Sequence, residues 1–495
     1  MKYISSILLC IILSQVVNAQ PVYKDTYWKL GRHAGLDFST GIPNPILTDN
    51  CQSTMNNTST QICDRNNHVI FYSNALYVTN RLDNIMPNGT CNAGTISSQY
   101  LSQDFYPPAK AAVIIPFPND SNKFYMFYEN LEWSIDGDYQ PEKLYYLIVD
   151  KTLDGGLGDV TLKDQIVIQY DTLTKGEVLA VKHGNGKDWW IVCRKFKSNR
   201  YYKILVDASG VHQPVSQDIG IPYTEHDAYV GICNQTLDGE KMVFGYSSYE
   251  FSPLHPCQVD VFDFDRCTGS LSNNKCLIFP NVTDSIFWGE FCFSPNNRFL
   301  YCSEGVKIWQ LDLTAANIPN SKILVGTFIN TGGLNSLFAM KIGPDNRIYI
   351  GPYGSGRYVH VIKYPDSLGV ACQFQQDAID YGGVTTWADG GMPNVPNFAL
   401  GPKAPCGDGV ENIQTAITAL DVFPNPSNGT AKISSPNDLK TIIIYNLTGN
   451  IVEEASIKNE KKYELNVSNF FNGVYLIEAE DKEGLKQYKK LIVQH

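Results

Sequence analysis

The sequence predicts an all-β protein, in which a seven-bladed β-propeller, with six blades as the alternative, precedes a small Ig-like β-sandwich. Three observations predict this fold. Pairs of apolar-alternating runs recur along the chain, tight-turn dipeptides mark them at near-regular intervals, and the composition is rich in turn-forming and aromatic residues. Of 495 residues, 39 are Gly and 26 are Pro, and 12 % are aromatic. This composition is typical of a β-protein with many turns.

Six double hairpins can be aligned along the chain. In each, the first pair of runs closes on a tight turn, at dipeptides such as Asn66-Asn67, Asn185-Gly186 or Asn296-Asn297 that tolerate positive φ. Successive turns lie at positions 66, 121, 185, 238, 296 and 345, so they are 55, 64, 53, 58 and 49 residues apart. Four strands per unit at this spacing are close to the roughly 50-residue period of kelch-type propeller blades. The units span residues 61–94, 111–167, 178–220, 231–279, 289–326 and 341–374.

Strand-like sequence is left over at both ends of this region, at residues 27–39 and 384–401. A propeller can close its ring by building one blade from both termini, which removes the exposed sheet edges. We therefore expect a seventh blade made in this way. An array of β-sandwiches is the rival interpretation, but it would not need such even spacing.

The first 19 residues have the pattern of a cleaved secretory signal peptide. Lys2 gives a positive start, Ile4 to Val17 is apolar, and Val17-Asn18-Ala19 is a small-residue cleavage site. The apolar run is too short for a comfortable membrane span, and no other run approaches that length. The mature propeller is expected to span residues 20–402.

Removal of the signal takes away Cys10 and leaves 12 of the 13 cysteines, an even number in an exported chain. Disulfides are the default expectation for such cysteines, and metal sites are less favoured because no pair has C-x-x-C spacing. Connectivity does not follow from sequence. The close candidate pairs are Cys292 with Cys302, Cys257 with Cys267 or Cys276, Cys51 with Cys63, and Cys372 with Cys406.

A linker is expected at residues 403–417, and a compact unit of seven short strands at 418–495. This unit resembles the type A C-terminal sorting domain of the type IX secretion system. The resemblance implies that the unit engages the type IX machinery, which moves the folded protein across the outer membrane to be released or held at the cell surface. It rests on Phe423 to Pro426 with Gly429, Ile442 to Asn446 with Gly449, Leu465 to Ser468, Gly473 to Tyr475 and Lys489 to Val493.

The preceding region is similar to a family of exported propeller proteins of uncertain function. That resemblance implies a fold and a compartment, and no catalytic residues. It is carried by Tyr27-Trp28, Ile70 to Asn74, Ile85 to Gly89, His183 to Trp190, Phe293 to Pro295 and Met392 to Phe398.

Charge and motifs exclude several functions. The net charge is -11 with no Lys/Arg block, which argues against nucleic acid and anionic membrane surfaces as partners. No phosphate-binding loop, zinc-protease motif or nucleophile elbow is present, so we expect neither a cofactor nor a metal. A polysaccharide or a surface protein is the expected ligand.

Candidate binding residues lie in the connections between hairpins and between blades, on the face opposite the tight turns. Aromatic rings beside carboxylates, His and Arg suit a sugar ring or a cationic group. For each residue a structural role is the competing interpretation, since the aromatic rings can fill the space between blades and the charges can belong to solvated loops. The candidates are Trp133, Glu225, His226, Asp227, Trp288, Glu290 and Arg357.

Two functional hypotheses follow. The first is an exported binding or interaction module without catalytic residues. The second is a carbohydrate-active enzyme, a polysaccharide lyase or glycosidase, with its site at the channel mouth. In a β-elimination a base removes a proton while Arg neutralises the uronate carboxylate, and the candidates for these roles are His226, Tyr229 and Arg357.

Overall fold

The computed structural model divides the chain into two compact units, Met1–Gly407 and Asp408–His495. Each unit is described by itself. The described residues are 23–495 except 32, 48–51, 56, 93, 102–105, 134–138, 224–229, 248–256, 280–287, 330–335, 354, 382–387, 390, 404–405, 407–419, 447–450 and 483–485. The predicted signal peptide therefore lies outside them, as does most of the predicted linker.

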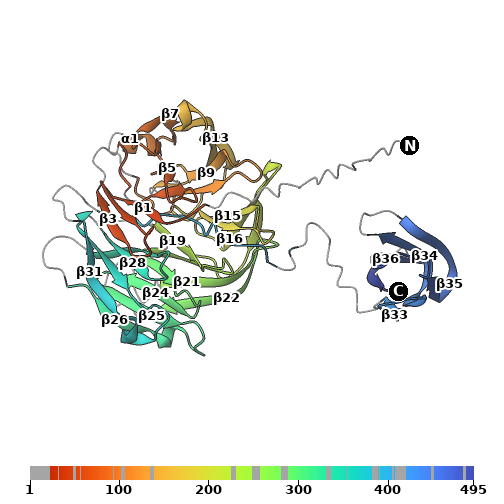
Figure 1. The fold of residues 1–495 in the computed structure, drawn as a ribbon. Helices are drawn as coiled ribbons and strands as arrows, with labels where there is room; N and C mark the ends of the chain where they lie inside the picture. The colour runs from red at the N-terminus through yellow and green to blue at the C-terminus, as the bar shows by residue number, and fades with distance from the viewer. Residues whose placement is uncertain are drawn as a thin grey trace, which may run out of the picture. The chain divides into compact units, whose positions relative to one another are not determined.

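The first unit contains six successive antiparallel sheets, each built around four neighbouring strands. They follow one another in chain order through the unit (Figure 1). The first three are β4 (Thr60–Cys63), β5 (Val69–Ser73), β6 (Tyr77–Asn80) and β7 (Ile85–Thr90); β8 (Ala112–Pro116), β9 (Lys123–Glu129), β12 (Leu144–Asp150) and β13 (Asp159–Ile168); and β14 (Leu179–Lys182), β15 (Trp189–Arg194), β16 (Arg200–Asp207) and β18 (Val215–Asp218), with β17 (Gly210–Val211) beside β16.

The next three sheets repeat the same order, so all six predicted double hairpins are confirmed. They are β19 (Val230–Gln235), β20 (Lys241–Ser247), β21 (Cys257–Asp265) and β22 (Ser270–Phe279); β23 (Trp288–Phe293), β24 (Phe299–Glu304), β25 (Lys307–Asp312) and β26 (Ile323–Thr327); and β27 (Ser336–Ile342), β28 (Ile348–Tyr353), β30 (Tyr358–Ile362) and β31 (Phe374–Asp380). Short pairs lie at β10 (Glu132–Trp133) with β11 (Tyr139–Gln140), and at β29 (Ser355–Gly356) with β32 (Ala388–Asp389).

Five of the six predicted tight turns have positive φ at their second residue: Asn67 at 68°, Gly186 at 75°, Gly239 at 69°, Asn297 at 61° and Asn346 at 63°. Asn and Gly are the residues that enter this region at least cost. The remaining turn also lies at the predicted residues 121–122, where Lys123 N–H donates to Asp120 O at 3.2 Å, but the positive φ of this loop is at Asn119.

An N-terminal three-stranded sheet precedes the six. It consists of β1 (Tyr27–Leu30), β2 (Ala34–Asp37) and β3 (Asn44–Leu47). The expectation that one blade would combine both termini is wrong for residues 391–401, which form no strand. This stretch contains Pro393 and Pro396, which lack the N–H that a ladder needs.

The first strands of the sheets form the inner layer of the unit. Contacts connect β1 with β4, β4 with β8, β8 with β14, β14 with β19, β19 with β23 and β23 with β27. The N-terminal sheet also shares a core with the last sheet, where Trp28 packs edge-on against Tyr349 at 5.5 Å between ring centroids.

Residues 391–403 together with Cys406 run along these inner strands, and we call them the clasp. Asn394 is its central residue. Its backbone N–H donates to Ser59 O at 2.7 Å, and its side-chain amide donates to Ala112 O at 2.9 Å and Val178 O at 2.7 Å. One residue, through its backbone and its side chain, thus connects the beginnings of three neighbouring sheets.

The C-terminal unit is also all-β. Its strands are β33 (Asp421–Phe423), β34 (Thr430–Asn446), β35 (Ile451–Asn466), β36 (Gly473–Asp481) and β37 (Lys486–Val493), in the order β33-β34-β36-β37 with β35 pairing β34. Seven short strands were expected, but β34 and β35 each merge two of them. The register shifts between Ser434 and Thr441, so a bend replaces the expected turn.

Helices are few and short. The described residues include α1 (Ser97–Leu101) and three 3₁₀ turns, η1 (Asp154–Gly156), η2 (Pro319–Ser321) and η3 (Gly369–Cys372). None of the helices in this part of the chain has the length and apolar character needed to cross a membrane.

Candidate functional site at the channel mouth

Trp133 lies on the face opposite the tight turns, as the topology predicts. It ends β10, which extends the connection from β9 to β12. Its side chain is 59 % exposed, and its ring meets Tyr139 edge-on with 6.2 Å between centroids. The Glu132 carboxylate accepts a hydrogen bond from Thr95 N–H at 2.9 Å, which fixes the base of this hairpin. Trp133 is therefore an indole held on a short hairpin with much of its surface open.

Glu290 lies instead inside the unit. It is 4 % exposed, forms an ion pair with Lys110, and accepts a hydrogen bond from Met340 N–H at 2.9 Å. Lys110 also donates to Cys233 O at 2.6 Å. Burial alone would lower the pKa of Lys110, but the Glu290 carboxylate outweighs it and the pKa is raised. Lys110 precedes β8 and Glu290 is in β23, so the pair joins two sheets that are not neighbours.

Arg357 lies on the surface between β29 and β30. Its guanidinium binds both carboxylate oxygens of Asp380 in β31, with Nη2 to Oδ2 at 2.6 Å. The pKa of Arg357 is raised by this hydrogen-bonded partner. Trp133, Glu290 and Arg357 belong to three different sheets, and each is held by its own neighbours.

The other predicted residues cannot be placed in the same way. Glu225, His226, Asp227 and Tyr229 lie outside the described residues, and so does the side chain of Trp288, whose backbone begins β23. Most of the face that the sequence assigns to binding therefore lies in these loops.

Sequence reasoning missed a group of buried charges beneath this face. Arg194 at the end of β15 is 2 % exposed and forms a two-point ion pair with Glu177, at 2.9 Å from Nε and 2.7 Å from Nη2. Its guanidinium also donates to Gly245 O at 3.0 Å in β20 and lies 3.8 Å from the centre of the Tyr223 ring. Burial alone would lower the pKa of Arg194, but the Glu177 carboxylate, together with Tyr223 and Tyr201, acts in the opposite direction and the pKa is raised overall.

Glu129, the last residue of β9, is the most perturbed carboxyl of this group. Burial raises its pKa to about 8, although the Gly176 N–H that donates to Oε2 at 2.8 Å acts in the opposite direction. Its Oε1 is buried and has no hydrogen-bond partner among the described residues. Burial therefore shifts this carboxyl towards its protonated form.

A weak signal for these residues was present in the sequence. Lys110, Glu129, Glu177 and Arg194 all directly flank or end apolar runs of the predicted hairpins, where a charge is unexpected unless it has a partner. The partners come from other sheets or from distant positions, so no local spacing reveals them.

A small cavity lies between the inner strands and the clasp. Its volume is about 70 Å³, and it is lined by Lys110, Asn234, Cys292, Met340 and Lys341 on the sheet side and by Met392, Asn394 and Asn397 of the clasp. This volume holds a few waters and no sugar ring.

The cysteine predictions are mostly corrected. The disulfide present joins Cys267 and Cys406, 139 residues apart, so Cys372–Cys406 and Cys257–Cys267 are wrong. Cys63, Cys276, Cys292, Cys302 and Cys372 are free thiols, which also removes Cys292–Cys302 and Cys257–Cys276, while Cys51 lies outside the described residues. Cys292 and Cys302 are on paired strands, but the register places Cys292 opposite Tyr301.

The described part of the site offers an exposed aromatic ring and paired charges. Burial raises the pKa of Cys292, so this thiol at the cavity stays protonated. No group of three His, Cys, Asp or Glu suited to a metal ion occurs in the part of the chain that the structure describes.

Comparisons with known proteins match the C-terminal unit to a family and find only distantly similar structures for the larger part of the chain. Residues 421–494 match the secretion system C-terminal sorting domain. An endo-acting ulvan lyase of Formosa agariphila is 37 % identical over 84 residues, which are 16 % of each protein, so the chain spans about one sixth of that relative's length. Among solved structures, PorZ, an essential surface component of the type IX secretion system of Porphyromonas gingivalis, is 11 % identical at a TM-score of 0.31, covering 94 % of this chain and 73 % of PorZ.

A putative 6-phosphogluconolactonase from Bacteroides uniformis is likewise 11 % identical, at a TM-score of 0.42, covering 76 % of this chain and 98 % of that one. These structural likenesses are too distant to transfer an activity. The sorting-domain match is different in kind, since it covers the whole C-terminal sheet and confirms the resemblance found in the sequence. Residues 421–494 therefore belong to the C-terminal sorting domains of the type IX secretion system, and the protein is exported to the cell surface or secreted.

Proposed function

We propose that this protein is an exported β-propeller that binds a glycan or a surface protein through the loop face at its channel mouth. In this proposal the signal peptide at residues 1–19 directs export from the cytoplasm, and the sorting domain then engages the type IX machinery. The ring has seven blades, of which the N-terminal three-stranded sheet is one, and the sorting domain is an Ig-like sandwich.

The exposed indole of Trp133 is the observation that carries the binding role. A large aromatic ring that is 59 % exposed, on a hairpin that projects from the loop face, offers a stacking surface. The Trp133 ring contacts Tyr139 nearly at right angles, with 6.2 Å between the ring centroids. Beneath it, Lys175 lies 4.2 Å from the Tyr139 ring centre, so the platform is backed by a cation.

A binding experiment on the mature full-length protein tests the proposal. Glycan and surface-protein arrays would first identify a saturable ligand, and Trp133→Ala should then weaken its binding about tenfold or more, because one stacked ring contributes on the order of 1–3 kcal/mol. Phe471→Ala is the matched control, since Phe471 is an 87 % exposed ring in the C-terminal unit. Equal binding by Trp133→Ala and the parent protein would overturn the assignment of this face.

The enzymatic alternative receives no support from the described residues. Arg357 would have to leave its two-point pair with Asp380 to neutralise a uronate. His226 and Tyr229, the other members of that hypothesis, lie outside the described residues.

A further inference from the structure

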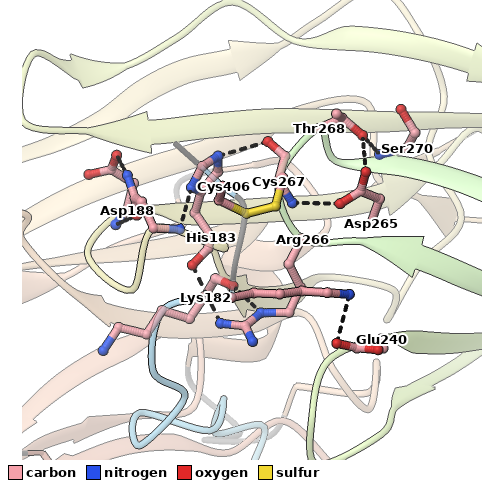
Figure 2. Close-up of a disulfide and its surroundings, with 12 residues drawn as sticks. Lys182, His183, Asp188, Glu240, Asp265, Arg266, Cys267, Thr268, Ser270 and Cys406 are labelled. Atoms are coloured by element: carbon pink, nitrogen blue, oxygen red, sulfur yellow. Dashed lines mark hydrogen bonds and ion pairs between the residues drawn. A yellow bond between two sulfur atoms is a disulfide. The ribbon is translucent and has the colours of Figure 1, made fainter. Parts of the chain in front are cut away.

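The clasp ends in a covalent bond on the tight-turn side of the channel. Cys406 forms a disulfide with Cys267, which follows β21, and Figure 2 shows this bond beside His183 and Arg266. The two cysteines are brought together by the path of the clasp through the channel. The disulfide therefore joins the end of the clasp covalently to the fourth sheet.

The residue that faces the disulfide, Gly184, leaves room for its two sulfur atoms. Gly184 faces both sulfurs so closely that a Cβ at this position would overlap Cys406 Sγ and lie 2.7 Å from Cys267 Sγ. Its φ is not positive, so the lack of a side chain, and not the backbone conformation, is what this position requires. Gly184 O also accepts a hydrogen bond from Lys403 N–H at 2.7 Å, and Gly184 N–H donates to Arg266 O at 2.8 Å.

Side chains on both sides hold the two cysteines in place. The His183 ring bonds Cys267 O through Nε2 at 2.8 Å, and Asp265 accepts from Cys267 N–H at 2.8 Å (Figure 2). Arg266 donates to Gly401 O of the clasp at 2.9 Å, and Lys403 pairs with Glu240 at 2.8 Å.

We propose that the clasp is an oxidation-dependent latch that closes the propeller after the chain has left the reducing cytoplasm. Before oxidation the clasp is held by the Asn394 and Asn397 hydrogen bonds and by Phe398 packing, and it can leave the channel. After oxidation it cannot. The free thiols of the described blades are buried except for the partly exposed Cys276, whereas this pair joins residues from different parts of the unit.

The chemistry requires an oxidant of the thiol–disulfide exchange class. One thiolate of the pair attacks the disulfide of that oxidant to give a mixed disulfide, and the second thiolate displaces the oxidant. The two cysteine sulfurs lose two electrons and two protons, and the oxidant leaves as a dithiol. A compartment that maintains such oxidants lies outside the cytoplasm, which agrees with export of this chain.

The experiment compares the oxidised full-length protein with the same protein after a phosphine reductant is added. Hydrogen exchange in peptides from residues 391–403 reports whether the clasp leaves the channel. Maleimide labelling of Cys292, which lines the cavity beneath the clasp, reports the same opening from the sheet side. Both rates should rise at least tenfold on reduction, and the Tm should fall by about 5 °C.

Two variants separate the latch from a general loss of stability. Gly184→Ala should leave Cys267 and Cys406 as free thiols and reproduce the effect of reduction without removing either sulfur. Cys372→Ser is the control, because it alters a buried free thiol away from the clasp and should leave exchange at residues 391–403 unchanged. If Gly184→Ala does not fold, the reductant experiment on the folded parent protein still decides the question.

Unchanged exchange at residues 391–403 and unchanged Cys292 labelling in the reduced protein would overturn the latch. A disulfide that forms in Gly184→Ala as completely as in the parent would overturn the role of Gly184. Loss of glycan or protein binding alone would not bear on either, so failure of the proposed function and failure of the latch are distinguishable.

Discussion

The two ends of the channel are stabilised by different kinds of interaction. At the mouth, buried charges connect the sheets through the Lys110–Glu290 and Glu177–Arg194 pairs. At the tight-turn end, backbone hydrogen bonds, the His183 ring and a disulfide hold the clasp. The mouth thus contains the buried pairs of Lys110 and Arg194, whereas the turn end contains the disulfide.

The two ends therefore keep their strands in place in different ways. Buried ion pairs connect strand ends near the mouth, whereas a disulfide connects the end of the clasp to the fourth sheet at the turn end.

The largest expected effect is the removal of Arg194. Arg194→Met leaves Glu177 buried without its cation and removes the hydrogen bond to Gly245 O. We expect the free energy of unfolding to fall by about 3–5 kcal/mol, which is typical when one partner of a buried pair is lost. Guanidinium unfolding followed by Trp fluorescence would measure it.

The double variant Arg194→Met with Glu177→Gln is the control, because it removes the unpaired charge as well. It should recover a substantial part of the loss. If the double variant were as unstable as the single one, burial of an uncompensated Glu177 would not be the cause.

The next effect concerns pH and depends on Glu129, the buried carboxyl at the end of β9. Folding raises the pKa of Glu129 from 4.5 to about 8. The folded protein then binds the proton more tightly than the unfolded chain, so this group's contribution is complete below pH 4.5 and is lost as the pH rises through 8. Glu129→Gln keeps an acceptor for Gly176 N–H and cannot ionise.

We therefore expect Glu129→Gln to gain stability relative to the parent as the pH rises from 5 to 9, by a few kcal/mol at most at about 1.4 kcal/mol per pKa unit. Thermal unfolding of both proteins across this range would measure the difference. A constant difference across the range would show that Glu129 is already ionised at pH 5.

A smaller effect, independent of pH, is expected at the tight-turn end. Gly269 has φ at 68°, and a Cβ there would lie 3.0 Å from the Trp190 ring. Gly269→Ala should lower the free energy of unfolding by roughly 1–2 kcal/mol through backbone strain and contact with the ring. Chemical unfolding at pH 5 and pH 9 should give the same decrease in the free energy of unfolding. A decrease that grows with pH would show that a titrating group, and not strain alone, determines the effect of Gly269→Ala.

Local patterns predicted the sheets well because each blade is made of hairpins close in sequence. Dipeptides such as Asn296-Asn297 and Asp238-Gly239 predicted turns, because a turn depends on the backbone preferences of adjacent residues. The positive φ at Asn297 and Gly239 confirms these turns. The bend in β34 was missed for the complementary reason. Residues 435–440 look like a turn, but pairing with β35 and β36 on either side keeps the strand continuous.

The clasp and the candidate site depend on contacts between residues far apart in the chain. Local sequence patterns do not predict such contacts. Asn394 bonds residues more than two hundred positions away, and Cys406 pairs with Cys267 across 139 residues. Choosing disulfide partners by proximity in sequence failed because the clasp brings its end back to an earlier sheet. Trp133 was predictable because its place follows from topology alone.

The smallest expected effect is at the exposed ion pair of Arg357 with Asp380. Both side chains are largely open to solvent, where water and salt weaken the attraction and ordering two side chains has an entropic cost. Arg357→Gln should leave the Tm unchanged in differential scanning calorimetry at 0.15 M salt. Arg200→Gln is the matched variant, since its pair with Asp218 has the same two-point geometry on the surface. If Arg357→Gln lowered the Tm while Arg200→Gln did not, Arg357 would have a structural role at the mouth. The buried ion pairs would then not be the sole charges that stabilise the mouth.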